Sequence, residues 1–198
     1  MGTGKGYGKT ILFGEHFVVY GLPSIVSALG ACTTADVEVI RGKGWTVNDQ
    51  RPATPGYKEQ KHNEAMQSIA NVINHLKVDI ENQRLEISFA GDLIAASGVG
   101  ASAAQCTSLA RALSETFNLN LDNEKINEAA YEGEKAYHGT PSGIDNTAST
   151  YGGLIWFVRN LSGGKNTMDL LQSPRKMLIV LANSGITAST TEVVADVR

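Results

Sequence analysis

Cysteine, long apolar runs and an excess of positive charge are all missing from this sequence, and each absence removes a class of protein. The 198 residues include only two cysteines, Cys32 and Cys106, too few for a disulfide framework. We interpret both as small buried residues in a reducing compartment. The longest apolar stretches are too short to span a bilayer, and the N-terminus has no apolar signal core, so we expect a cytoplasmic protein without membrane contact. The net charge of −3 and the absence of a Lys/Arg run argue against nucleic-acid binding.

Glycine, by contrast, is abundant, and its placement indicates where loops carry function. Many of the 21 glycines cluster at residues 2–8, 42–44, 96–100 and 139–153. Glycine allows positive φ angles and close approach of the backbone to a ligand, so such clusters are typical of functional loops.

The hydrophobic pattern predicts mixed strands and helices. Strands are expected at 10–19 (interrupted by Gly-Glu-His), 33–40, 85–89, 154–158 and 177–181, and a polar loop or hairpin at 42–61. Helical spacing appears at 63–77 and 106–117, and Asp122 is a plausible N-cap for a helix ending near Tyr137. A further helix is expected to begin at 187. This alternation, without internal repeats, predicts an α+β fold.

The segment Ala96–Gln105, ASGVGASAAQ, has the features of a phosphate-binding loop without matching the common ones. It lacks the lysine of a Walker loop, and it has only two of the three glycines of a dinucleotide loop. A strand, a small-residue loop and a helix starting near Ser102 would still present free N–H groups and a positive helix end to an anion. The alternative is an ordinary tight turn that Ser102 caps.

Two other segments carry polar residues in places that are unusual for a core. Lys9, Glu15 and His16 lie in or beside an apolar strand and are flanked by glycines. Glu134 lies on a helix that leads into a Gly/Pro/Ser loop presenting Asp145. Carboxylate oxygens of this kind suit Mg²⁺. The alternative is a solvated Glu and a capping Asp.

Together and in this order, the three segments resemble the GHMP kinases, the galactokinase, homoserine kinase, mevalonate kinase and phosphomevalonate kinase superfamily. GKTILFGEHFVVYG (8–21) and HGTPSGIDNTASTYGG (138–153) are similar to motifs of its mevalonate kinase family, and SGVGASAA (97–104) is similar to the loop that wraps the ATP phosphates. The resemblance implies an α+β N-terminal domain like ribosomal protein S5 domain 2. It also implies phosphorylation of mevalonate by ATP, with Mg²⁺, in isoprenoid and sterol biosynthesis, and it leaves a homodimer open.

The resemblance also implies roles for individual residues. Lys9 and Asp145 would be catalytic, the aspartate beside the attacking hydroxyl and the lysine stabilising charge on the phosphates. Both would also contact mevalonate, together with Glu15 and His16. Ser102 and Glu134 would bind Mg²⁺. The ATP phosphates would be held by Ala96, Ser97, Gly98, Val99, Gly100, Ala101 and Ser102.

The sequence departs from the family pattern in several places. Tyr7 stands where a proline is usual, Ala101 replaces a first serine and Val99 replaces a leucine. The family's third motif, a second glycine-rich loop, does not occur in these residues. We therefore interpret residues 1–175 as the N-terminal domain and 176–198 as the beginning of a C-terminal domain that is mostly absent. An exposed apolar patch, and with it self-association, would follow.

Two other interpretations stay open at this point. One is another small-molecule kinase of the superfamily, such as a galactokinase or phosphomevalonate kinase, although Phe17–Gly21 after the Gly-Glu-His segment favours mevalonate. The other is a non-catalytic fragment that binds a nucleotide or a protein partner.

Overall fold

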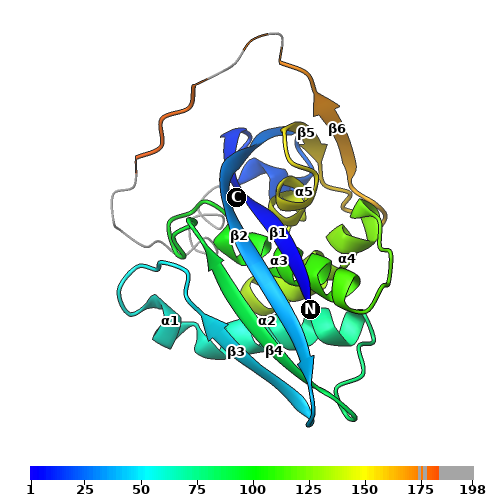
Figure 1. Cartoon of the computed structure of the whole chain (residues 1–198). Helices are drawn as coiled ribbons and strands as arrows, with labels where there is room; N and C mark the ends of the chain where they lie inside the picture. Colours follow the sequence, from blue (N-terminus) through cyan, green and yellow to red (C-terminus); the bar gives the residue numbers. More distant parts are fainter. Residues whose placement is uncertain (174, 176–177, 183–198) are drawn as a thin grey trace.

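A six-stranded sheet with helices packed on one of its faces forms the frame of the molecule in the computed structural model (Figure 1). The structure describes residues 1–173, 175 and 178–182. The strands are β1 (Gly2–Phe13), β2 (Ser24–Ile40), β3 (Gly44–Asp49), β4 (Arg84–Gly91), β5 (Leu154–Val158) and β6 (Thr167–Leu171). The helices are η1 (Phe17–Tyr20), α1 (Tyr57–Gln60), α2 (His62–His75), α3 (Ala101–Thr116), α4 (Asn123–His138) and α5 (Ile144–Tyr151).

The long strand β2 organises the sheet. It pairs along one edge with β1, antiparallel, and along the other edge with β4 and then β5, so that the order is β3-β4-β2-β5-β6 with β1 paired to β2. The β3–β4 pair is the parallel one, whereas β5 and β6 run antiparallel. The arrangement confirms the α+β prediction.

The N-terminal glycines allow helix α3 to lie directly on strand β1. A Cβ atom added at Gly4 would lie 2.0 Å from the carbonyl oxygen of Ser108, and one added at Gly6 would lie 2.2 Å from that of Ala104. No side chain larger than hydrogen fits at these positions. The alternation of glycine along β1 therefore sets the distance between the sheet and the helix whose first turn borders the candidate site.

The main hydrophobic core lies between the sheet and α2, α3 and α4. It contains Val37 from β2, Leu85, Ile87 and Phe89 from β4, and the apolar faces of the three helices. A second cluster joins β2, β5 and α5, and Phe157 is fully buried there. Helix α4 begins where expected, because the side chain of Asp122 accepts a hydrogen bond from the backbone N–H of Lys125.

Three predictions of local structure were wrong. The strand expected at 10–19 begins at Gly2 and ends at Phe13, and residues 17–20 form a 3₁₀ helix. The polar segment 42–61 contains strand β3 and helix α1, because its residues 44–49 pair with the distant strand β4. Of the strand expected at 177–181, the described residues 178–181 pair with none of the described strands, and Leu178 and Val180 are exposed.

The predicted start of a C-terminal domain at 176–198 lies outside the described residues, apart from 178–182, as does the helix expected from 187. Both cysteines are free; Cys106 is buried as expected, whereas Cys32 is partly exposed.

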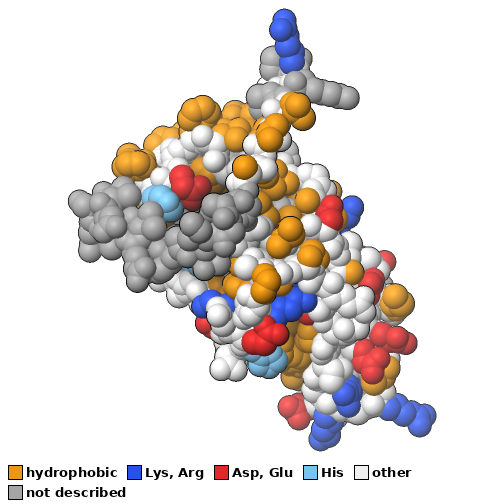
Figure 2. Space-filling view, turned by 90° about the vertical axis from the view of Figure 1, so that its left-hand side faces the viewer, with side chains coloured by type: hydrophobic (Ala, Val, Ile, Leu, Met, Phe, Trp, Pro, Cys, Tyr) orange, Lys and Arg blue, Asp and Glu red, His pale blue; other side chains and the backbone are white. Residues whose placement is uncertain are grey.

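Large apolar side chains are exposed near the end of β1, around η1, on β6 and in the turn that precedes β6. They include Phe13, Phe17, Leu22, Leu161 and Leu170. In Figure 2, hydrophobic side chains gather over the upper part of the face shown. The self-association expected from such a surface stays a prediction. None of the helices in the described part of the chain has the length and hydropathy that crossing a membrane requires.

Candidate active site

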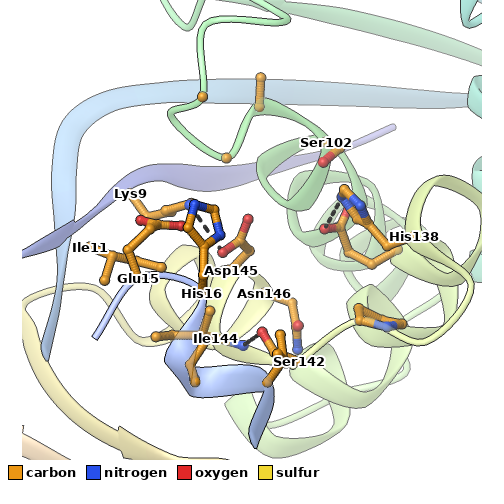
Figure 3. A pocket seen from close by; sticks show the side chains of 18 of the residues that line it. Lys9, Ile11, Glu15, His16, Ser102, His138, Ser142, Ile144, Asp145 and Asn146 are labelled. Carbon is orange, nitrogen blue, oxygen red and sulfur yellow. Dashed lines mark hydrogen bonds and ion pairs between the residues drawn. The ribbon is translucent and has the colours of Figure 1, made fainter. Parts of the chain in front are cut away.

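A pocket of about 490 Å³ brings together residues from all three of the sequence segments that carry polar groups. Its walls come from β1, the turn into η1, the loop before α3, the end of α4 and the start of α5. The predicted site residues that line it are Lys9, Glu15, His16, Ala96, Gly98, Gly100, Ala101, Ser102, Glu134 and Asp145. Residues more than 130 positions apart in the sequence thus share one cavity (Figure 3).

Lys9 and Asp145 form an ion pair at the centre of this pocket. The Lys9 Nζ atom lies 3.3 Å from Asp145 Oδ1, and the lysine is almost fully buried. Burial alone would lower the pKa of Lys9, but attraction by Asp145, Glu15 and Glu134 outweighs it and raises that pKa. The ammonium group is therefore held in its charged form, facing the carboxylate.

The backbone around the pair explains why these two side chains meet. Strand β1 carries Lys9 under the phosphate-loop candidate, whose Val99 carbonyl accepts a 2.8 Å hydrogen bond from the Lys9 N–H. Gly100 leaves room for the lysine stem, since a Cβ there would lie 2.7 Å from Lys9 Cγ. Asp145 is the second residue of α5, whose N-cap Gly143 is in the left-handed conformation at φ 89°.

Glu134 is a second carboxylate in the pocket wall, and it is almost completely buried. Burial, and then repulsion by Asp145, raise its pKa to about 8, although a hydrogen bond from the Ser102 side chain and the charge of Lys9 act in the opposite direction. His138, one helical turn further on, places Nε2 3.7 Å from Glu134 Oε2. A buried carboxylate without a full counter-charge is a group that a cation would stabilise.

The loop before α3 leaves the start of that helix open. Ala96, Gly98 and Gly100 have φ angles of 67°, 75° and 74°, so the chain turns sharply in the left-handed region before Ala101. Gly100 is the N-cap and provides no side-chain hydrogen bond. The expected alternative of a turn capped by Ser102 is therefore not what the structure shows, and the start of α3, whose first N–H groups have no partner within the helix, borders the pocket.

Two predicted members of this loop lie outside the pocket lining. The Ser97 hydroxyl donates to the carbonyl of Ile94 at 2.6 Å, and the Val99 side chain packs with a small apolar cluster that includes Leu93 and Ala95. The backbone of both residues still shapes the loop.

Glu15 and His16 lie where β1 turns into η1. Figure 3 shows both side chains in the same part of the pocket as Lys9 and Asp145. His16 adopts φ 63°, a conformation that few residues other than glycine take readily. The tight turn, with Gly14 at φ 86°, brings the two polar side chains back toward the strand from which they come.

Sequence reasoning assigned no role to several residues that line the pocket. Arg159 contributes a cation on the side of Glu15 and His16, and its Nη1 donates to the Val19 carbonyl at 3.3 Å. Tyr57 also lines the pocket. Neither lies in a recognisable pattern, because Tyr57 begins the short helix α1 and Arg159 follows β5, and only the tertiary fold brings them to the site.

Comparisons with known proteins found a matching family model and similar proteins. The model of the GHMP kinases N terminal domain matches residues 63–153. The mevalonate kinase of Pyrococcus furiosus is 30% identical over 96% of this chain. A crystal structure of L. major mevalonate kinase in complex with R-mevalonate superposes with a TM-score of 0.86 at 44% identity and covers the whole chain. A galactokinase of Lactococcus lactis complexed with galactose, at 17% identity and TM-score 0.63, shares the fold alone.

The fold and the site thus define a class: residues 63–153 match the N-terminal domain of the GHMP kinases, and the chain is similar to the N-terminal portion of members of that family. Within that family it is similar to mevalonate kinases along nearly its entire length. The chain spans 59% of the Pyrococcus protein and 60% of the L. major chain.

Proposed function

We propose that this protein is an ATP-dependent mevalonate kinase, which forms 5-phosphomevalonate and ADP. The observation that carries the proposal is the ion pair of the buried Lys9 with Asp145, which shares one pocket with the start of α3 and with Glu15 and His16. Transfer of a phosphoryl group depends on such positioning and on neutralisation of charge rather than on a covalent enzyme intermediate.

The side of the pocket formed by β1 and η1 suits a small branched hydroxy acid. Ile11 and Val18 provide apolar surface for a methyl group, and Arg159 provides a cation for a carboxylate. Glu15 and His16 are available for hydroxyl groups. The apolar surface of Ile11 and Val18 beside these polar groups suits a branched hydroxy acid better than a polyhydroxylated sugar, which favours mevalonate over galactose.

The side formed by the 96–101 loop and the start of α3 suits the phosphates of ATP. The backbone N–H groups at the beginning of α3 and the positive end of the helix would stabilise their negative charge. Small side chains at Gly98, Gly100 and Ala101 allow the phosphates to approach the backbone.

The residues here also fit Mg²⁺. No group of three or more His, Cys, Asp or Glu side chains in the described part of the chain is arranged to hold a metal by itself. Mg²⁺ bound with a nucleotide needs only one or two protein ligands, since phosphates and water supply the others. The buried carboxylate of Glu134 and the Ser102 hydroxyl are those ligands in this proposal. Bound Mg²⁺ would neutralise phosphate charge during transfer.

The chemical step assigns the remaining roles. The primary hydroxyl oxygen of mevalonate attacks the γ-phosphorus of ATP, the bond to the β-phosphate oxygen breaks, and ADP leaves. Asp145 accepts the proton that the hydroxyl group loses. Lys9 stabilises the charge that develops on the transferred group, and its ion pair orients the Asp145 carboxylate.

An assay of ADP release tests the proposal, with the protein in its natural full length and with mevalonate, galactose, phosphomevalonate or no acceptor. We expect turnover that depends on both mevalonate and Mg²⁺. Turnover with galactose or phosphomevalonate instead would indicate another kinase of the family, and nucleotide binding without turnover would indicate a non-catalytic module. The cytoplasmic location and the homodimer stay predictions, which cell fractionation and sedimentation test.

A further inference from the structure

Arg51 is a buried cation that does not line the pocket and that the mechanism above does not use. It lies just after β3, and only 6% of its surface is exposed. Its guanidinium group lies over the ring of Phe89, with Cζ 5.3 Å from the ring centre. Arginine is rarely buried to this degree in a folded protein, so its position requires an explanation.

Asp49 neutralises the charge of Arg51 in a two-pronged ion pair. Arg51 Nε donates to Asp49 Oδ1 at 2.9 Å, and Nη2 donates to Oδ2 at 2.7 Å. Lys58 approaches the same aspartate from the more exposed side, with Nζ donating to the Asp49 backbone carbonyl at 2.7 Å. The pair is therefore held in one orientation by the strand end and the following segment.

The other edge of the guanidinium group reaches the first turn of α3. Arg51 Nη1 donates to the Ala101 carbonyl at 3.2 Å, and Nη2 donates to Gln105 Oε1 at 2.6 Å. Gln105 is buried as well. Ala101 is the first residue of α3 and precedes Ser102, so Arg51 contacts the turn that borders the phosphate side of the pocket.

Arg51 is also the first residue of a segment, 51–57, that reaches the pocket at Tyr57. The Ala95 N–H donates to the Pro52 carbonyl at 2.9 Å, and the Thr54 N–H donates to the Ala95 carbonyl at 3.1 Å. These bonds join residues 52–54 to Ala95, the residue before the phosphate loop, and the segment ends at Tyr57, which lines the pocket. Arg51 thus links both walls of the nucleotide half.

Stability alone explains this arrangement poorly. A buried ion pair is often no more stabilising than apolar side chains of the same volume, and a cation beside a helix N-terminus opposes the helix dipole. What a planar guanidinium group provides is orientation, because its donors are fixed relative to one another and satisfy the carboxylate and the helix at the same time.

We propose that Arg51 is a positioning residue for nucleotide binding. Through Ala101 and Gln105 it holds the first turn of α3, and with it Ser102, at a set distance from the wall that carries Tyr57. The nucleotide half of the pocket then has its binding geometry before the ligand arrives, so less of the binding free energy is lost to ordering. The inference deepens the proposed function, because it concerns the ATP side of the same site.

The test compares Arg51→Lys and Gln105→Met with Lys58→Met in the full-length protein. Lysine keeps the charge but loses the planar fork, and Gln105→Met removes one acceptor while leaving the Asp49 pair intact. Lys58→Met is the matched control, since Lys58 contacts the same aspartate without reaching α3. Calorimetry measures Kd for MgATP without mevalonate, and steady-state kinetics give KM for each substrate.

We expect Arg51→Lys and Gln105→Met to raise Kd and KM for MgATP by about tenfold, the size of losing one charge-assisted hydrogen bond. KM for mevalonate should change less than about twofold, and Lys58→Met should match the wild type. Folded variants with unchanged Kd for MgATP, or with both KM values raised equally, would overturn the inference. Because Kd for MgATP is measured without mevalonate, a wild type that binds nucleotide but fails to phosphorylate mevalonate would contradict the proposed function alone.

Discussion

Replacing Glu134 by glutamine should make the protein more stable and at the same time weaken the proposed Mg²⁺ site. The wild-type carboxyl is buried in a pocket wall where its charged form is disfavoured, which raises its pKa to about 8 from an ordinary 4.5. The folded protein therefore binds this proton more tightly than the unfolded chain does. As the pH rises from about 4.5 to about 8, the free energy of unfolding falls, and above that window it levels off.

The size of the effect follows from the same shift. Between pH 4.5 and pH 7 the unfolded chain loses the proton while most of the folded protein keeps it, which corresponds to about 3 kcal/mol at 1.36 kcal/mol per pH unit. Glutamine has nearly the same shape, carries no charge and can still accept a hydrogen bond from Ser102. We expect Glu134→Gln to recover about 2 to 3 kcal/mol at pH 7, or roughly 5 to 10 °C in Tm.

Urea unfolding at a series of pH values from about 5 to 8 measures this directly. Glu132→Gln is the matched control, since Glu132 lies on the same helix but forms an exposed pair with Lys135. The wild type and the control should lose stability across the window, whereas Glu134→Gln should not. A Glu134→Gln protein that is no more stable at pH 7, with an unchanged dependence on pH, would refute the reasoning. The same variant should bind MgATP more weakly.

The remaining predictions concern the sheet–helix contact, the central ion pair and the partly buried Asp49. Gly4→Ala should cost about 3 kcal/mol or prevent folding, because its Cβ would lie 2.0 Å from the Ser108 carbonyl oxygen, whereas Gly30→Ala, with no atom within 4 Å of an added Cβ, should change stability little in thermal unfolding. Lys9→Met should lower kcat for mevalonate about 100-fold or more, and an unchanged kcat would remove Lys9 from the mechanism. Burial would raise the pKa of Asp49, but hydrogen bonds from Arg51 lower it. Its stabilising contribution is therefore present above pH ~3.8 and is lost as the pH falls through the lowered pKa, so Asp49→Asn should weaken the acid dependence of unfolding below about pH 4.

How far the sequence predicted the fold depended on whether the deciding contacts were local. Helix α4 and its Asp122 N-cap were predicted well, because apolar spacing and capping residues are local features of the sequence. The start of β1 was missed because glycine alternation is a poor strand signal, and only the closeness of α3 explains it. Strand β3 was missed because its partner β4 follows 35 or more residues later.

The same distinction between local and distant contacts applies to the candidate site. Lys9, Glu134 and Asp145 were predicted through their motifs, and the structure brings all three to one pocket. Arg51 and Arg159 had no such signal. Each is a single arginine after a strand. Its side chain donates to a backbone carbonyl that is distant in the sequence, and no local pattern indicates such a contact.

The most direct test of the central claim is phosphorus NMR of the full-length protein with MgATP and mevalonate, in the wild type and in Asp145→Asn. The account predicts a new phosphate monoester on the primary carbon of mevalonate, formed as ADP appears. Asp145→Asn should form it about 100-fold more slowly or worse. Release of inorganic phosphate alone, or equal ester formation by the Asp145→Asn protein, would contradict the account.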